Sequence, residues 1–134
     1  MKGSCLCGAV AFEAEPPPSG LRIGFCSCPS CRKAHAAPFN AYASVPRAGF
    51  RWLRGQEQVR SYRSSPDKQR HFCGVCGSQL MAEHAGADTV ILRVALLDED
   101  PAARPAEHIF LGHVVPWCDW HAPRCCWQAS RPKR

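Results

Sequence analysis

The sequence lacks the features that mark a membrane or secreted protein. No apolar run approaches the ~20 residues that a bilayer-spanning helix needs. No apolar run follows Lys2 at the N-terminus, as it does in a signal peptide. We therefore expect no membrane contact and a cytoplasmic protein, in which cysteines stay reduced. A Gly-rich phosphate loop and a dinucleotide fingerprint are also missing, which argues against the common nucleotide-dependent enzymes.

Long amphipathic helices, internal repeats and low-complexity linkers are absent as well, while 12 prolines and 10 glycines divide the chain into short segments. A length of 134 residues predicts one domain. We expect a single zinc-binding domain over residues 1–128 and a flexible basic tail over residues 129–134. The hydrophobic content of 46% supports only a modest core, and a small, interrupted core usually needs a metal or another cross-link.

Alternation of apolar and polar residues predicts several short strands separated by turns. These lie at 9–14, 21–25, 39–45, 59–63, 89–96 and 108–111. The most apolar of them, 89–96, is the expected central strand, and residues 32–36 are expected to form a helical turn. The predicted fold is mostly β: a compact, small, zinc-stabilised single domain of short antiparallel strands, with metal knuckles in the turns.

What the chain does have is cysteine. Seven of its 10 cysteines form two pairs and one triplet, at Cys5 and Cys7, Cys73 and Cys76, and Cys26, Cys28 and Cys31. In a reduced protein, Cys-x-Cys and Cys-x-x-Cys indicate metal ligands rather than disulfides. Disulfides remain the alternative if the chain is exported.

The two pairs together supply four thiolates, which is one complete tetrahedral zinc shell. Gly74 and Gly77 favour the tight turn that two thiolates three positions apart require, because glycine tolerates positive φ. Backbone N–H groups in such a turn can also donate to the sulfurs. A closed four-thiolate site of this kind stabilises a fold.

The triplet supplies three thiolates, which leaves one position of a tetrahedral shell free. Water, a substrate thiol or another side chain can fill that position, and His35 and Cys118 are the candidates for a closed structural site. An open position instead permits chemistry. The spacing alone does not decide between the two. Cys125 and Cys126 are adjacent and poorly arranged to chelate one ion, so they favour core packing or a redox-sensitive tail.

The formal net charge of +6 suggests an acidic partner. Seven thiolates and two zinc ions would reduce this charge to about +3. Lys and Arg are scattered, and no basic stripe is interleaved with exposed aromatic residues, so nucleic-acid binding is not favoured.

Three motifs carry a resemblance to a known family. They occupy residues 3–10 (GSCLCGAV), 26–33 (CSCPSCRK) and 70–78 (RHFCGVCGS), in one order and spacing. Together they resemble the glutathione-dependent formaldehyde-activating enzyme family, which also contains the centromere protein V domain. Further positions that suit the family are Phe50, Leu53, Gly55, Val59, Tyr62, residues 108–110 and Trp117.

The resemblance implies a compact, mostly-β zinc fold with two zinc ions per chain. It implies a structural zinc on Cys5, Cys7, Cys73 and Cys76, and a second zinc, associated with activity, on Cys26, Cys28 and Cys31. The activity implied is the addition of glutathione to formaldehyde, which gives S-hydroxymethylglutathione. The reverse reaction makes such an enzyme a carbon–sulfur lyase. Cys118, Cys125 and Cys126 lie outside the resemblance.

A zinc ion held by three thiolates is a weak Lewis acid, which favours exchange of its fourth ligand for an incoming thiol over activation of water. The bound thiol, held as a thiolate, is the nucleophile that attacks the aldehyde. Arg32, Lys33, Arg70 and His71 are candidates to anchor the carboxylates of glutathione. The alternative function is a non-enzymatic zinc domain that binds a thiol ligand or a protein partner.

Overall fold

The computed structural model describes residues 1–118, which form ten strands, one α-helix and four short 3-10 turns. In chain order the strands are β1 (Lys2–Ser4), β2 (Ala11–Ala14), β3 (Ile23–Cys26), β4 (Asn40–Pro46), β5 (Phe50–Arg54), β6 (Val59–Ser65), β7 (Lys68–Cys73), β8 (Gln79–His84), β9 (Thr89–Arg93) and β10 (Pro105–Ile109). The helix α1 covers Pro29–His35. The 3-10 turns are η1 (Arg47–Gly49), η2 (Gln56–Gln58), η3 (Val94–Leu96) and η4 (Leu111–His113). The predicted tail at 129–134 and the end of the predicted domain lie outside the described residues.

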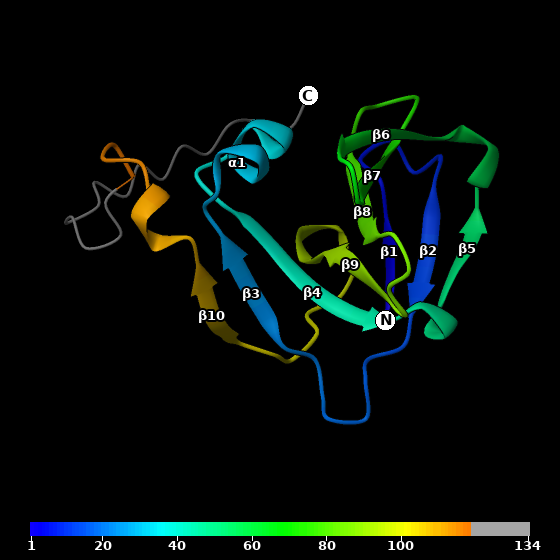
Figure 1. Cartoon of the computed structure of the whole chain (residues 1–134). Helices are drawn as coiled ribbons and strands as arrows, with labels where there is room; N and C mark the ends of the chain where they lie inside the picture. The colour runs from blue at the N-terminus through cyan, green and yellow to red at the C-terminus, as the bar shows by residue number, and fades with distance from the viewer. Residues whose placement is uncertain (119–134) are drawn as a thin grey trace, which may run out of the picture.

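The strands form two sheets, and the prediction of a mostly-β fold is confirmed (Figure 1). The small sheet has the order β1-β2-β5, and the large sheet has the order β10-β3-β4-β9-β8-β7-β6. Every neighbouring pair is antiparallel except β10 with β3, which is parallel. The expectation of antiparallel strands was wrong for this pair. The chain leaves β9 in the middle of the sheet and crosses to the far edge before β10 begins, and parallel pairing requires such a crossover.

The segment expected at the centre of the sheet does lie there. β9 is the fourth of the seven strands, with β4 on one side and β8 on the other. It is shorter than predicted, because residues 94–96 turn into η3. The expected strands at 9–14, 21–25, 39–45 and 59–63 appear with shifted ends as β2, β3, β4 and β6. The late strand at 108–111 is the end of β10 followed by η4, and the helical turn at 32–36 is the second half of α1.

Four strands, β1, β5, β7 and β8, were not predicted. The most consequential is β7, whose sequence Lys-Gln-Arg-His-Phe-Cys has no apolar alternation. Its neighbours β6 and β8 hold it by backbone hydrogen bonds along its whole length. Tertiary pairing therefore overrides a weak local strand preference.

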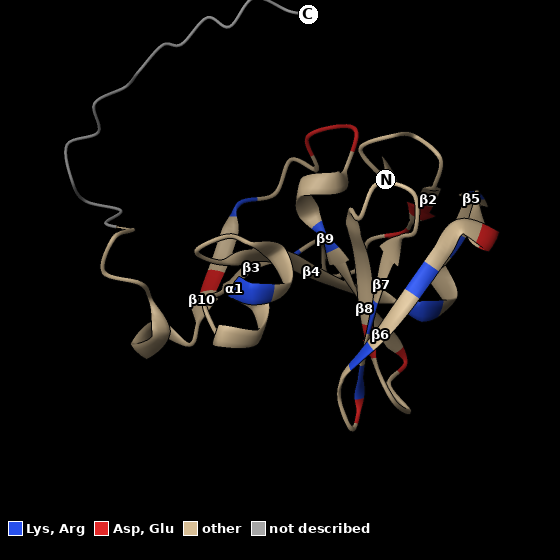
Figure 2. Ribbon diagram, turned by 90° about the horizontal axis from the view of Figure 1, so that it is seen from above, with Lys and Arg blue, Asp and Glu red and all other residues tan. Residues whose placement is uncertain are grey.

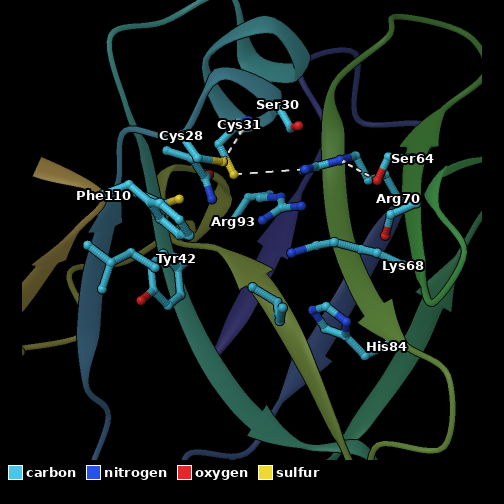
Figure 3. A pocket seen from close by; sticks show the side chains of 15 residues that line it. Cys28, Ser30, Cys31, Tyr42, Ser64, Lys68, Arg70, His84, Arg93 and Phe110 are labelled. Carbon is cyan, nitrogen blue, oxygen red and sulfur yellow. Dashed lines mark hydrogen bonds between the residues drawn. The ribbon is translucent and has the colours of Figure 1, made fainter. Parts of the chain in front are cut away.

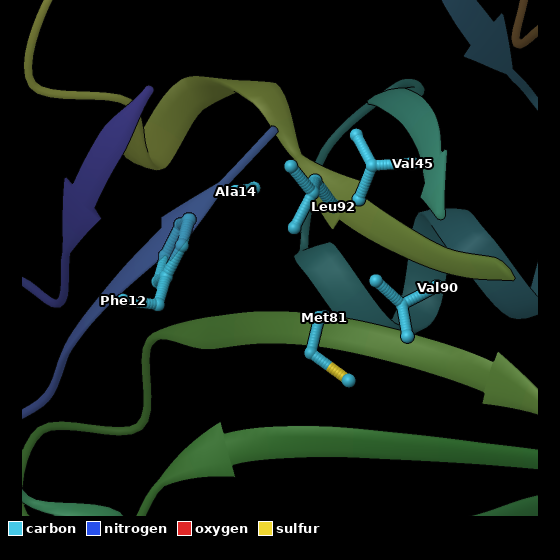
Figure 4. Packing of buried hydrophobic residues seen from close by; sticks show 6 residues of the cluster. All are labelled: Phe12, Ala14, Val45, Met81, Val90 and Leu92. Carbon is cyan, nitrogen blue, oxygen red and sulfur yellow. The ribbon is translucent and has the colours of Figure 1, made fainter. Parts of the chain in front are cut away.

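The main core lies between the two sheets, where one face of each must be buried (Figure 4). Phe12 and Ala14 of β2 contact a cluster from the large sheet that comprises Val45, Met81, Val90 and Leu92. The Phe12 ring also stacks on Phe50 of β5 at a centroid separation of 5.6 Å. Phe12 thus joins the two sheets.

Two further expectations concern partners. No helix among the described residues has both the length and the apolar character to cross a membrane. Figure 2 shows the Lys and Arg positions of α1, β6 and β9 on separate parts of the ribbon, as the scattered sequence pattern predicts.

Because Phe12 joins the two sheets, its replacement by alanine should weaken their junction strongly. We expect the free energy of unfolding to fall by about 3–5 kcal/mol, since the deletion removes a fully buried ring and leaves a cavity. Urea denaturation of the metal-loaded protein measures this change. Leu53→Ala on β5 is the control, because Leu53 is 45% exposed and should change stability by less than about 0.5 kcal/mol. Equal losses in both variants would contradict this description of the core.

Candidate metal centres

The two cysteine pairs meet in the structure. Cys5 and Cys7 lie in the turn between β1 and β2, and Cys73 and Cys76 lie at the turn between β7 and β8. All four sulfurs lie within 4.8 Å of one another. The Sγ–Sγ distances are 3.5 Å for Cys5 to Cys7 and 4.0 Å for Cys7 to Cys73. Tetrahedral thiolate ligands of zinc stand about 3.8 Å apart, given a Zn–S bond of about 2.3 Å, so this four-cysteine cluster can bind a metal ion.

The turns around the cluster follow the expected chemistry in part. Gly77 has a positive φ of 77°, as predicted. Gly74 does not, and its role is different: a Cβ there would come within 2.9 Å of the Gln58 carbonyl oxygen. Gly74 is therefore required for close approach of two backbones rather than for φ. The sequence predicts backbone donors to sulfur in the Cys73–Cys76 turn, and the structure places one beside the other pair, where the Val10 N–H donates to Cys5 Sγ at 3.3 Å.

The triplet is built where β3 runs into α1. Cys26 ends the strand, Cys28 caps the helix, and Cys31 lies in its first turn. Pro29 begins the helix, a position where the missing N–H costs nothing. The Cys31 N–H donates to Cys28 Sγ at 3.4 Å. The three sulfurs lie within 4.8 Å of one another and form a second group that can bind a metal ion.

Among the described residues, no fourth His, Cys, Asp or Glu joins the triplet. His35 and Cys118, the two candidates to close the site, both lie outside the group, and the other two tail cysteines lie outside the described residues. Burial, together with the nearby cations Arg93, Arg70 and Lys68, lowers the pKa of His35 to about 3, so the ring is neutral. All eight cysteines in the described part are free thiols, without a disulfide.

A cavity of about 410 Å³ opens beside the triplet, and all three triplet cysteines line it (Figure 3). Of the four-cysteine cluster, Cys76 lines a separate hollow of about 500 Å³. The lining of the cavity beside the triplet comes from the triplet, from strands of the large sheet and from the segment after β10: Cys26, Cys28, Ser30, Cys31, Asn40, Tyr42, Ser64, Ser65, Lys68, Arg70, His84, Ile91, Arg93, Ile109 and Phe110. Phe110 is 54% exposed and adopts a left-handed φ of 59°. Such a conformation costs about 1–2 kcal/mol for a residue with a side chain, and this one lies at the edge of the cavity.

The cavity carries positive charge and contains no acidic residue in its lining. Of the four candidate anchors, only Arg70 lines it. Arg32 donates to the Ser27 carbonyl at 3.1 Å, and Lys33 is exposed. His71 pairs with Glu83 at 2.9 Å and lies on the opposite face of β7 from Arg70, because side chains alternate along a strand.

Two cations that line the cavity were not predicted from the sequence. They are Lys68 and Arg93. Lys68 shares a face of β7 with Arg70, two positions away, and this signal becomes readable only once β7 is known to be a strand. Arg93 ends β9 and is a lone charge in an apolar segment. That isolation was a usable signal, because a charged residue in a buried strand requires a partner.

Both arginines are buried, each with 4% of its surface exposed. Arg70 donates from Nε to Ser64 Oγ at 3.0 Å and from Nη2 to Cys31 Sγ at 3.8 Å. Burial, together with the neighbouring Arg70, lowers the pKa of Arg93 to about 10. The cavity thus holds cations that the described part of the protein does not neutralise with a carboxylate.

A family model and one named relative point to the same family. A family model described as glutathione-dependent formaldehyde-activating enzyme matches residues 1–113, which include both cysteine groups. A Schizosaccharomyces pombe protein described as an uncharacterized lyase is 32% identical over 81 residues, or 59% of this chain and 54% of that protein. This chain therefore spans about half the length of that relative.

Two further similarities cover more of the matched protein. A Halomonas elongata protein, provisionally named a glutathione-dependent formaldehyde-activating enzyme, is 27% identical over 126 residues, or 89% of this chain and 80% of that protein. A crystal structure of a Rhodobacter sphaeroides protein superposes with a TM-score of 0.64 at 26% identity. It covers 75% of this chain and 90% of that one, so the two share the fold.

The buried charge of the cavity should carry a measurable cost in stability. In the absence of a thiol ligand, replacement of Arg93 by methionine should raise the free energy of unfolding by about 1–3 kcal/mol. The change removes a buried cation whose nitrogens are only partly hydrogen-bonded. Urea denaturation gives the value. Arg51→Met is the control, since Arg51 has a side chain that is 71% exposed and should change stability little. Destabilisation by Arg93→Met would show that the guanidinium supports the fold.

Proposed function

Because the chain belongs to the glutathione-dependent formaldehyde-activating enzyme family, we propose that it is a zinc-dependent enzyme of the carbon–sulfur lyase type. It adds a small thiol such as glutathione to formaldehyde or a related aldehyde, and it catalyses the reverse cleavage. The observation that carries this proposal is the unequal placement of the two cysteine groups. Only the triplet opens into the cationic cavity, whereas the four-cysteine cluster ties two turns together.

The proposal assigns two zinc ions per chain. Cys5, Cys7, Cys73 and Cys76 hold a structural zinc, in a shell that the protein completes. The triplet of Cys26, Cys28 and Cys31 holds the second zinc, and these residues serve catalysis through it. Thiolate ligands in tetrahedral spacing favour zinc over the harder divalent ions. Reduced thiolates also require a reducing compartment, which suits the expected cytoplasmic location.

Cys26, Cys28 and Cys31 would hold the second zinc, which would supply the positive charge that lowers the pKa of a substrate thiol and so favours its nucleophilic thiolate form. Arg70 donates to Cys31 Sγ and so withdraws negative charge from one thiolate of the set. The cations Lys68 and Arg93 raise the concentration of anionic ligands in the cavity. In the reaction, the thiol sulfur forms a bond to the aldehyde carbon, and the proton released by the thiol ends on the new hydroxyl group.

Glutathione suits this cavity in charge and in size. It carries two carboxylates and one ammonium group, and the lining offers three basic residues, Lys68, Arg70 and Arg93, with no acidic one. A metal-loaded triplet would carry a charge of about −1, which leaves positive charge in excess. A volume of about 410 Å³ falls in the usual range for small-molecule sites.

Cobalt substitution and exchange NMR together test the proposal. Addition of glutathione should change the absorption spectrum of cobalt at the triplet, because the thiol becomes a ligand. Exchange NMR of glutathione with formaldehyde should show interconversion with S-hydroxymethylglutathione faster than in buffer alone. A changed spectrum without faster exchange would identify the alternative function, a zinc domain that binds a thiol without turnover. An unchanged spectrum would indicate a closed metal site and refute the proposal.

The two metal sites should also separate by mutation. We expect Cys28→Ser to reduce the zinc content from two ions to one while the fold survives, because Cys28 serves only the triplet. Cys73→Ser should cost the structural zinc and several kcal/mol of stability, since metal binding at such sites contributes directly to folding. Elemental analysis and thermal unfolding check both outcomes. Two zinc ions in purified Cys28→Ser protein would disprove the ligand assignment.

A further inference from the structure

Arg93 presents a bonding edge that the described part of the protein leaves unused. Its Nη1 donates to the side-chain oxygen of Asn40 at 3.0 Å, with the Asn40 amide oriented so that its nitrogen donates to the Ala41 carbonyl at 3.2 Å. Its Nε and Nη2 have no hydrogen-bond partner, although both are buried. Asn40 is itself buried. The guanidinium is therefore fixed on one side and unsatisfied on the other.

The unsatisfied side has the geometry of a carboxylate receptor. Nε–H and Nη2–H lie side by side on one edge of the guanidinium, at the spacing that matches the two oxygens of a carboxylate. A buried polar group without a partner costs about 1–3 kcal/mol. Arg93 lines the cavity beside the triplet, so two such groups on one edge of its guanidinium indicate a ligand that bonds to both at once.

A second guanidinium reinforces this site. Arg70 uses Nε and Nη2 on Ser64 and Cys31, and its buried Nη1 has no partner. Figure 3 shows Arg93 between the triplet and Lys68, with Arg70 beside it. The contact of Arg70 with Cys31 places this group of nitrogens next to the triplet sulfurs, and no acidic side chain lines the cavity to neutralise them.

We propose that the Nε and Nη2 edge of Arg93, positioned by Asn40 and assisted by Nη1 of Arg70, binds a substrate carboxylate beside the cysteine triplet and selects carboxylate-bearing substrates. This inference rests on the proposed function for the identity of the substrate. The carboxylate has two possible sources in that reaction. It belongs either to the thiol, as in glutathione, or to the aldehyde, as in a 2-oxo acid such as glyoxylate. Neutral thiols and neutral aldehydes lack the group that this edge recognises.

Binding of S-methylglutathione tests the thiol source. This compound keeps both carboxylates of glutathione and has no free thiol, so its affinity does not depend on metal coordination. Calorimetry on the zinc-loaded protein should show that Arg93→Lys, which keeps the charge but loses the paired N–H edge, weakens binding by about 10- to 100-fold. Its diethyl ester should bind weakly to both proteins. Lys33→Met is the matched control, because Lys33 is exposed and does not line the cavity.

Glyoxylate tests the aldehyde source. With 2-mercaptoethanol as a neutral thiol, the ratio of kcat/KM for glyoxylate to kcat/KM for formaldehyde should fall by about 10- to 100-fold in Arg93→Lys if the edge binds the oxo acid. A loss confined to S-methylglutathione assigns the carboxylate to the thiol, and a loss confined to glyoxylate assigns it to the aldehyde. Arg93→Lys protein that matches the wild type in both arms overturns the inference.

The two proposals can fail separately. If S-methylglutathione binds in an Arg93-dependent way while glutathione leaves the cobalt spectrum unchanged, the carboxylate site stands and the proposed thiol chemistry falls. If glutathione and its diethyl ester change the cobalt spectrum with equal affinity, exchange with formaldehyde is accelerated and glyoxylate shows no preference, the chemistry stands and the carboxylate site falls.

Discussion

The junction of four sulfurs at Cys5, Cys7, Cys73 and Cys76 is the constraint on which the rest of the structure depends. It joins the first hairpin of the small sheet to the β7–β8 turn of the large sheet. The junction itself lies outside the cavity, yet β7, which it anchors at one end, carries cavity cations on one face. With the proposed metal bound, a cross-link of this kind would compensate for a core that the length of the chain keeps small.

Stability and chemistry are separated in this molecule. The interior between the sheets is apolar and closely packed around Phe12. The cavity beside the triplet instead holds two buried guanidinium groups, and no carboxylate among the residues that line it pairs with them. Buried cations of this kind oppose folding. Their retention is understandable if an anionic ligand completes the site, because ligand binding then stabilises the folded protein.

Local chemistry was readable from the sequence, and long-range pairing was not. Each cysteine pair, and the triplet, spans at most six consecutive positions, so the spacing reveals what these cysteines can bind. Strands with apolar alternation, such as β2 and β4, were equally legible. β7 was not, because neighbouring strands rather than its own side chains define it, and Lys68 was missed with it. The parallel pairing of β10 with β3 likewise depends on a crossover that no local sequence pattern predicts.

The distance along the chain between the paired cysteines has a consequence during synthesis. Cys7 and Cys73 are 66 residues apart, which a ribosome covers in roughly 3–13 s at about 5–20 residues per second. The triplet, in contrast, is complete as soon as Cys31 has been translated. A nascent chain therefore acquires its local metal-binding group before the one that joins its two sheets. For those seconds the early cysteines depend on the redox buffer and the metal supply of the cell, and scarce metal would meet the triplet before it meets the cluster that joins the sheets.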